Sequence, residues 1–114
     1  MSRLKEYGGR TLVELDGNRI KEYGGRSLYE IDGDRVKIYG GKTIFEIDGD
    51  RIKEYGGRTL LEFDGKRLKH YGGSTIYEVV DNKIKEYGGR TIYEIDGFIS
   101  RRELMALLAV LFAS

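Results

Sequence analysis

The chain of 114 residues consists almost entirely of six consecutive copies of one 16-residue unit. The tripeptide Tyr-Gly-Gly marks each copy, at Tyr7, Tyr23, Tyr39, Tyr55, Tyr71 and Tyr87. Asp-Gly follows later in five copies, whereas the fifth copy has Val80-Asp81 at that place. A unit this short cannot bury an apolar face alone, so the copies must pack on one another around a shared core.

Each copy predicts a β-hairpin. Asp-Gly and Gly-Gly between β-branched and aromatic runs are strong signals for two-residue hairpin turns. Two such turns per copy give twelve short strands in an antiparallel up-and-down meander. If the loops are Gly24-Gly25 and Asp32-Gly33, Tyr23 lies opposite Arg26 and Ile31 lies opposite Asp34.

This register sorts the side chains into an apolar face and a charged face. The apolar face carries a central row of Leu4, Val13, Ile20, Tyr29, Val36, Phe45, Ile52, Leu61, Leu68, Tyr77, Ile84 and Tyr93, flanked by Leu15, Ile31, Ile47, Phe63, Val79 and Ile95. The charged face carries the ladder Arg19-Glu30-Arg35-Glu46-Arg51-Glu62-Arg67-Glu78-Lys83-Glu94, with Leu28, Ile44 and their equivalents beside it. A slip of one residue would exchange the faces, so the pattern predicts that the apolar face is the core.

After Gly97 the pattern changes to that of a helix over residues 100–113. Ser100 and Glu103 have the spacing of a capping box, in which each side chain bonds the other's backbone amide. Residues 104–113 have no polar face, and a helix that is apolar all round must be buried all round. We expect this helix to enter at the rim of the Asp-Gly turns, which places Arg101 and Arg102 beside aspartates.

A twelve-stranded antiparallel meander followed by an apolar C-terminal helix resembles the tubby-like architecture, which is shared with LURP-one-related proteins and phospholipid scramblases. The resemblance covers the whole chain, rests on strand number and helix placement, and transfers no functional residue. It implies a mainly β fold: one domain over residues 1–114, with six hairpins over residues 4–97 closed into a barrel around the helix.

Closure of the barrel imposes a condition on the register. A barrel of tilted strands needs a stagger between strands, and uniform two-residue turns provide none. We therefore expect a shift of about two residues per hairpin, placed at the Gly-Gly turns, where a bulge forms easily. The alternatives are an open twisted sheet or a six-petal array of hairpins packed on the helix.

The composition argues against an enzyme. The chain has no cysteine, which excludes a disulfide framework and a thiolate zinc site. His70 is the single histidine and replaces the glutamate of other copies, and the repeated Asp-Gly-Asp lacks the ligands of a calcium loop. The sequence predicts no catalytic residue, no cofactor and no metal site.

The remaining expectations concern location and assembly. The net charge is +1, the N-terminus carries no secretory signal, and the one long apolar run is too short for the roughly 20 residues that a membrane helix needs. These features predict a cytoplasmic protein that is a monomer or a small homo-oligomer.

Three functions fit the repeat. The first is a structural or scaffold barrel without small-molecule chemistry, and its near-identical copies suit either a recently amplified natural repeat or a consensus design. The second is binding of phospholipid head groups or nucleic acid by a basic outer face comprising Lys5, Lys21, Lys37, Lys53, Lys69, Lys85, Arg26, Arg58 and Arg90. The third is glycan binding on the row of six tyrosines that begin the Tyr-Gly-Gly motifs.

Overall fold

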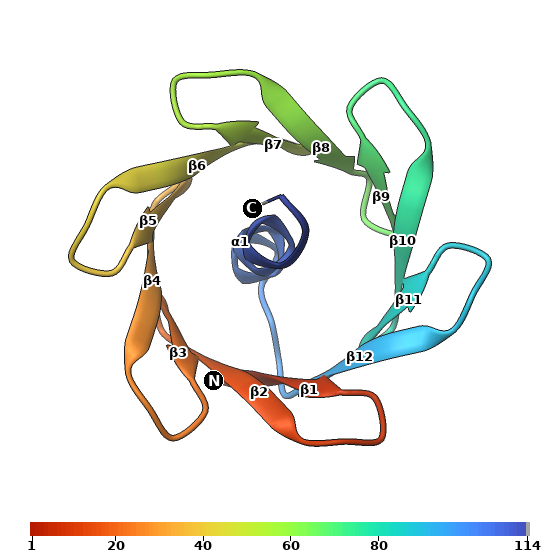
Figure 1. Cartoon of the computed structure of the whole chain (residues 1–114), viewed down its shortest axis with the longest axis horizontal. Helices are drawn as coiled ribbons and strands as arrows, with labels where there is room; N and C mark the ends of the chain where they lie inside the picture. Colours follow the sequence, from red (N-terminus) through yellow and green to blue (C-terminus); the bar gives the residue numbers. More distant parts are fainter. Residues whose placement is uncertain (114) are drawn as a thin grey trace.

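Twelve antiparallel strands close into a barrel around one central helix in the computed structural model, which describes residues 1–113 (Figure 1). Each strand pairs with its neighbours in sequence, and β1 pairs with β12 to complete the ring. The predicted barrel is therefore confirmed, and the open sheet is wrong. The elements are β1 (Ser2–Glu6), β2 (Thr11–Asp16), β3 (Arg19–Glu22), β4 (Ser27–Asp32), β5 (Arg35–Ile38), β6 (Thr43–Asp48), β7 (Arg51–Glu54), β8 (Thr59–Phe63), β9 (Arg67–His70), β10 (Thr75–Val80), β11 (Lys83–Glu86), β12 (Thr91–Asp96) and α1 (Arg101–Phe112).

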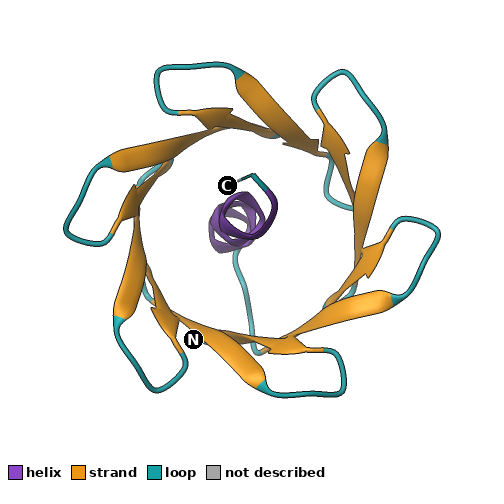
Figure 2. Cartoon of the chain, in the orientation of Figure 1, coloured by secondary structure: helices purple, strands orange, loops and turns teal. Residues whose placement is uncertain are grey.

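The six hairpins that carry the Gly-Gly turns splay outward from the closed wall. In the view down the barrel axis their turns lie at the outer margin of the molecule, and α1 lies at the centre (Figure 2). The hairpins thus project like petals, as in the alternative arrangement, but they remain paired with one another along the whole ring.

The Asp-Gly turns differ from the prediction by two residues of register. Asp32 pairs with Arg35 and Ile31 pairs with Val36, so the two-residue loop is Gly33-Asp34 and not Asp32-Gly33. Gly33 has a φ of +63°, and Asp34 does not share this left-handed conformation. Positive φ at the first central residue alone, with glycine there, is the pattern of a type II′ turn, which suits strand twist as well as type I′ does.

The Gly-Gly turns differ by one residue because of a bulge. Ile20 lies opposite Tyr29 as predicted, but the register shifts between Ile20 and Lys21. The amide of Glu22 then donates to Arg26 O at 2.9 Å, and a tight turn places Tyr23 in the loop with the two glycines. The bulge that we expected at this end is present, and it bends the hairpin away from the wall.

These turns together supply the stagger that closure requires. Ile20 lies opposite Tyr29, and Tyr29 lies opposite Ile38. The residue equivalent to Ile20 in the next copy is Val36, so the pairing has moved by two residues over one repeat. The predicted shift of two residues per hairpin is correct, but it arises at the Gly-Asp turns rather than at the Gly-Gly turns. A shift of about one residue per strand is the ratio found in the eight-stranded TIM barrel, whose strands tilt by about 36°.

The interior holds the apolar face, as predicted. Leu4, Ile20, Val36, Ile52, Leu68 and Ile84 are all at most 1% exposed, and Leu15, Phe63 and Ile95 are buried in the row beside them. Four residues that were assigned to the charged face, Ile44, Leu60, Ile76 and Ile92, instead pack against the core. The reason is the bulge, which inserts one residue into each of these strands and breaks the alternation of sides.

The helix enters at the rim that carries the Gly-Asp turns, as predicted. The Ser100 hydroxyl accepts from the Glu103 amide and the Glu103 carboxylate accepts from the Ser100 amide, which completes the capping box. Arg101 reaches the turn aspartate Asp50 at 2.7 Å. Residues 105–109 are at most 1% exposed inside the barrel. In the part of the chain that the structure describes, no helix is long and apolar enough to cross a membrane.

The fifth copy contains the one strained turn. Asp81 has a φ of +57° and is the only residue other than glycine with positive φ among residues 1–113. We expect Asp81→Gly to stabilise the protein by about 0.5–1 kcal/mol, because relief of about 1–2 kcal/mol of left-handed strain outweighs the roughly 0.4–1 kcal/mol entropic cost of glycine. Urea unfolding measures the change.

The control for this turn is Val80→Asp, which restores the repeat at the preceding residue. Val80 pairs with Lys83 as the last strand residue and lies outside the loop. This substitution should leave the free energy of unfolding almost unchanged. A gain from Val80→Asp and none from Asp81→Gly would show that the turn is relaxed as it stands.

The turn of the fourth copy contains an aspartate that makes stability depend on pH. Asp64 Oδ1 accepts from the amides of Arg67 at 2.7 Å and Lys66 at 2.9 Å, and these two bonds hold the pKa of Asp64 below its ordinary value. The stabilisation is therefore complete above the ordinary carboxyl pKa of about 3.9 and is lost as the pH falls through the lower folded pKa. Asp64→Asn should be less stable than the parent at neutral pH, and this difference should shrink in acid unfolding experiments.

Candidate binding surfaces

The outer wall carries a regular pattern in which each glutamate lies between two cations. Glu30 of β4 lies opposite Arg19 of β3 and Lys37 of β5. The corrected register gives the same arrangement for the other five, which are Glu14, Glu46, Glu62, Glu78 and Glu94. The predicted ladder in which Glu30 is followed by Arg35 is therefore wrong on one side, and lysine takes the place of that arginine.

All six lysines of the predicted anion-binding face belong to this pattern. Lys5, Lys21, Lys37, Lys53, Lys69 and Lys85 lie opposite Glu94, Glu14, Glu30, Glu46, Glu62 and Glu78. None of the six ammonium groups lies within 4.0 Å of a carboxylate among the described residues; the close partners of the glutamates are Arg3, Arg51, Arg67 and Lys66. The lysines thus share a wall with the glutamates and keep their ammonium groups free.

The arginines of the predicted face lie elsewhere. Arg26, Arg58 and Arg90 each reach the glutamate four residues earlier across their own Gly-Gly turn, at 3.7–3.9 Å. Their side chains are 80–83% exposed, so these pairs are weak. The structure does not bring these arginines together with the lysines, because they pair across the turn while the lysines point to the outer wall.

The tyrosines of the Tyr-Gly-Gly motifs each lie beneath a cation. The guanidinium of Arg19 is 5.2 Å from the ring centre of Tyr39, and the same contact recurs around the barrel. The other pairs are Arg3–Tyr23, Arg35–Tyr55, Arg51–Tyr71, Arg67–Tyr87 and Lys83–Tyr7, at 5.2–5.7 Å. The six side chains are about half exposed, so each ring has one side covered by a cation and keeps part of its surface accessible.

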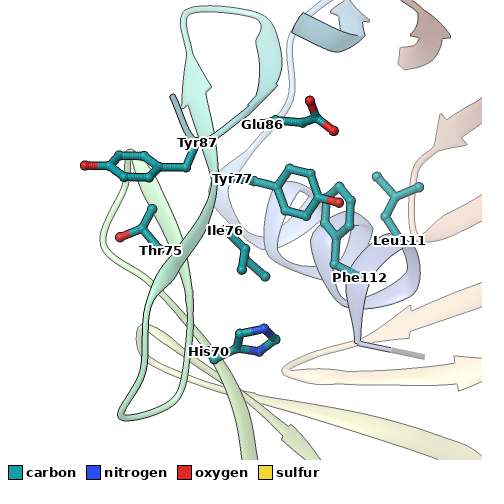
Figure 3. A pocket seen from close by; sticks show the side chains of 8 residues that line it. All are labelled: His70, Thr75, Ile76, Tyr77, Glu86, Tyr87, Leu111 and Phe112. Carbon is teal, nitrogen blue, oxygen red and sulfur yellow. The ribbon is translucent and has the colours of Figure 1, made fainter. Parts of the chain in front are cut away.

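Grooves separate neighbouring hairpins at the rim of the Gly-Gly turns. One groove of about 450 Å³ lies between the last and first hairpins and includes Arg90, Tyr93 and Glu6. A second of about 370 Å³ includes Arg58 and His70 and reaches Phe112 of α1. A third of about 620 Å³ lies between the fifth and sixth hairpins and is shown in Figure 3.

His70 lies in two of the grooves, and no group of three or more metal-ligating residues occurs within residues 1–113. The predictions that the chain is not an enzyme and holds no cofactor or metal stay predictions.

No family model, curated protein or solved structure matches the chain. The resemblance to the tubby-like architecture therefore stays a prediction.

Sequence reasoning missed the aromatic and acidic side chains that meet at the third groove. Tyr77, Glu86 and Phe112 come from β10, β11 and α1, and the stagger of the barrel brings them together. One signal was available: the pair Glu–Arg recurs four residues apart in four copies, and His70–Ser74 replaces both members at once.

Proposed function

We propose that the chain is a non-enzymatic scaffold, a rigid barrel that holds six equivalent hairpins at fixed positions. The filled interior carries this proposal. Residues 105–109 of α1 are at most 1% exposed, so the helix occupies the middle of the barrel, where a substrate would otherwise bind. A packed interior of this kind resists deformation, which is the property that a scaffold needs.

The repeat itself supports the same function. Equal copies place equal surfaces around the ring. Such an arrangement suits a protein that presents several equivalent surfaces better than one that needs a single asymmetric active site. Both an amplified natural repeat and a consensus design would produce these copies. Strand number and central helix support a tubby-like architecture, and the lack of cysteine suits the reducing cytoplasm. We propose a monomer or a small homo-oligomer.

A second candidate is binding of an anionic ligand, either phospholipid head groups or nucleic acid, and the six lysines favour it. Their ammonium groups lie more than 4.0 Å from any described carboxylate. Against it, the aspartates that end four strands, Asp16, Asp32, Asp48 and Asp96, lie opposite the wall arginines and offset their charge. Mixed signs at this spacing weaken the long-range field that steers polyanions. Glycan binding is a third candidate, favoured by the half-exposed rings of the tyrosine row.

Co-sedimentation with anionic vesicles and with DNA, at low and moderate salt, separates the first two functions. The scaffold predicts no salt-sensitive binding. Two variants sharpen the result: one replaces the six lysines of the wall with glutamine, and the matched control replaces Arg26, Arg58 and Arg90 with glutamine. Binding that is lost in the lysine variant and kept in the arginine variant would overturn the scaffold and establish the anion-binding wall. A glycan array tests the tyrosine row, and binding lost on Tyr→Ala substitution would establish the third function.

A further inference from the structure

One hairpin breaks the sixfold pattern at the rim of the Gly-Gly turns. Four hairpins carry an arginine that pairs with a glutamate across the turn, and the third carries Lys42 beside Ile38. The fifth hairpin, between β9 and β10, has Ser74 and His70 at these two places. It is the only hairpin without a long cationic side chain at this position.

The groove beside this hairpin is the largest of the three. It measures about 620 Å³, whereas the grooves that include Arg58 and Arg90 measure about 370 and 450 Å³. Pockets of about 300–1,000 Å³ hold small molecules in other proteins. Arg58 and Arg90 line the two smaller grooves, whereas Ser74 has no long side chain that could extend over this one.

The wall of this groove that faces α1 is aromatic and acidic. His70, Ile76, Tyr77 and Glu86 point toward the helix, whereas Thr75 and Tyr87 point to the opposite side of the hairpins (Figure 3). The rings of Tyr77 and Phe112 stack with centres 4.0 Å apart and planes 24° apart. Tyr77 pairs directly with Glu86 across the strands, and the Glu86 side chain lines the same groove as the stacked rings.

The charges around the stacked rings favour a cation. The groove meets the C-terminal end of α1, which carries partial negative charge and has no basic residue in its last turn. Glu86 has Arg90 at 3.9 Å, but the Arg90 side chain is 83% exposed, so water screens this pair, and Arg67 lies over the ring of Tyr87. A carboxylate, a helix C-terminus and the faces of aromatic rings all attract positive charge.

We propose that this groove binds an organic cation with a trimethylammonium group, which Tyr77 contacts through the ring face turned away from Phe112 and which Glu86 neutralises. Aromatic faces beside a carboxylate recognise quaternary ammonium groups because these groups combine positive charge with an apolar surface. Ile76 and Leu111 extend the apolar wall. The groove faces the helix, so its occupation does not depend on the outer wall of lysines.

The test is a titration of the full chain with choline, monitored by the backbone amide signals in two-dimensional ¹H–¹⁵N NMR spectra. Choline should shift the amide signals around the groove, those of His70, Glu86 and Phe112. The matched probes are its uncharged isostere, in which a tert-butyl group replaces the trimethylammonium group, and the anion pivalate. Both should bind at least about fivefold more weakly, since they lack the cation–π attraction. Equal affinity for the uncharged isostere would overturn the proposal.

Variants locate the site. Ser74→Arg restores the residue of four other hairpins, so it should fold, and it should abolish choline binding by filling the groove with a like charge. Ser74→Ala is the control and should keep the affinity of the parent. Glu86→Gln should weaken choline binding about fivefold or more, whereas Glu22→Gln, at the same place in the second copy, should not. Choline binding that survives Ser74→Arg in a folded protein would place the site elsewhere and refute the assignment.

A separate arm identifies the source of the trimethylammonium group. Sedimentation with phosphatidylcholine vesicles that free choline reverses would establish a lipid head group as the ligand. Binding of free choline without sedimentation would establish a small molecule. Sedimentation that choline does not reverse would count against the groove as the point of attachment.

Discussion

Replacing Leu108 with aspartate should leave the protein unfolded at room temperature. Leu108 is fully buried at the centre of α1, surrounded by the apolar rows of the barrel wall. Truncation of such a leucine to alanine costs about 2–5 kcal/mol. Aspartate adds a buried charge without a partner, and the sum approaches or exceeds the usual margin of about 5–15 kcal/mol. Circular dichroism and thermal melting measure the loss.

The matched control is Phe98→Asp, which places the same charge on the segment that leads into the helix. Phe98 is 81% exposed, so this substitution should change the melting temperature little. Truncation after Gly97 tests the same point without a new charge, because it leaves the interior rows facing an empty barrel. A truncated monomer with the β signal and melting temperature of the full chain would show that the barrel does not need its helix.

The sequence was sufficient to predict the elements of the fold because each depends on a local pattern. Alternation of sides assigns Ile20 and Ile52 to the interior whatever the turns do, and their burial confirms it. The helix likewise follows from a capping box and from residues with no polar face. These features survive an error in register of two residues, since a shift of two keeps every side chain on its own face.

The turns could not be predicted because they depend on closure of the whole barrel. Asp32-Gly33 and Gly33-Asp34 both satisfy the local chemistry of a two-residue turn. The choice between them sets the stagger of the strands, and only a ring of twelve strands around a helix makes one stagger better than another. The charge pairs of the outer wall were assigned from the predicted register. Of the nine neighbouring pairs in the ladder, the four that span these turns were therefore wrong.

The groove beside Ser74 was beyond sequence reasoning for a related reason. Tyr77 and Phe112 lie 35 positions apart in the chain, and they stack because the helix C-terminus emerges at the rim of the fifth hairpin. The repeat produces six equivalent hairpins at this rim, and only the position of α1 makes the surroundings of one hairpin different. Local exceptions such as His70 and Ser74 acquire a meaning once that position is known.

At the seam between the first and last strands, a glycine-to-alanine substitution should reduce the free energy of unfolding more than at the other glycines. Gly97 has a φ of +95°, and a Cβ there would lie 2.8 Å from Met1 O and 3.3 Å from Ser2 Cα. Both contacts are with backbone, which cannot rotate aside as a side chain does. Gly97→Ala must therefore move the start of β1, whose residues Ser2 and Leu4 are buried against the wall.

The control separates this clash from backbone strain alone. Gly33 also has positive φ, and a Cβ there meets nothing within 4 Å. Gly33→Ala should cost about 1–2 kcal/mol, the usual penalty for a side chain in the left-handed region. Gly97→Ala should cost about 1–3 kcal/mol more, as overpacking does elsewhere. Denaturant unfolding gives both values, and hydrogen exchange should show faster opening at the amides of β1 and β12 in the Gly97 variant alone. Equal losses for the two variants would mean that the N-terminal strand adjusts freely and that the ring closes without a tight seam.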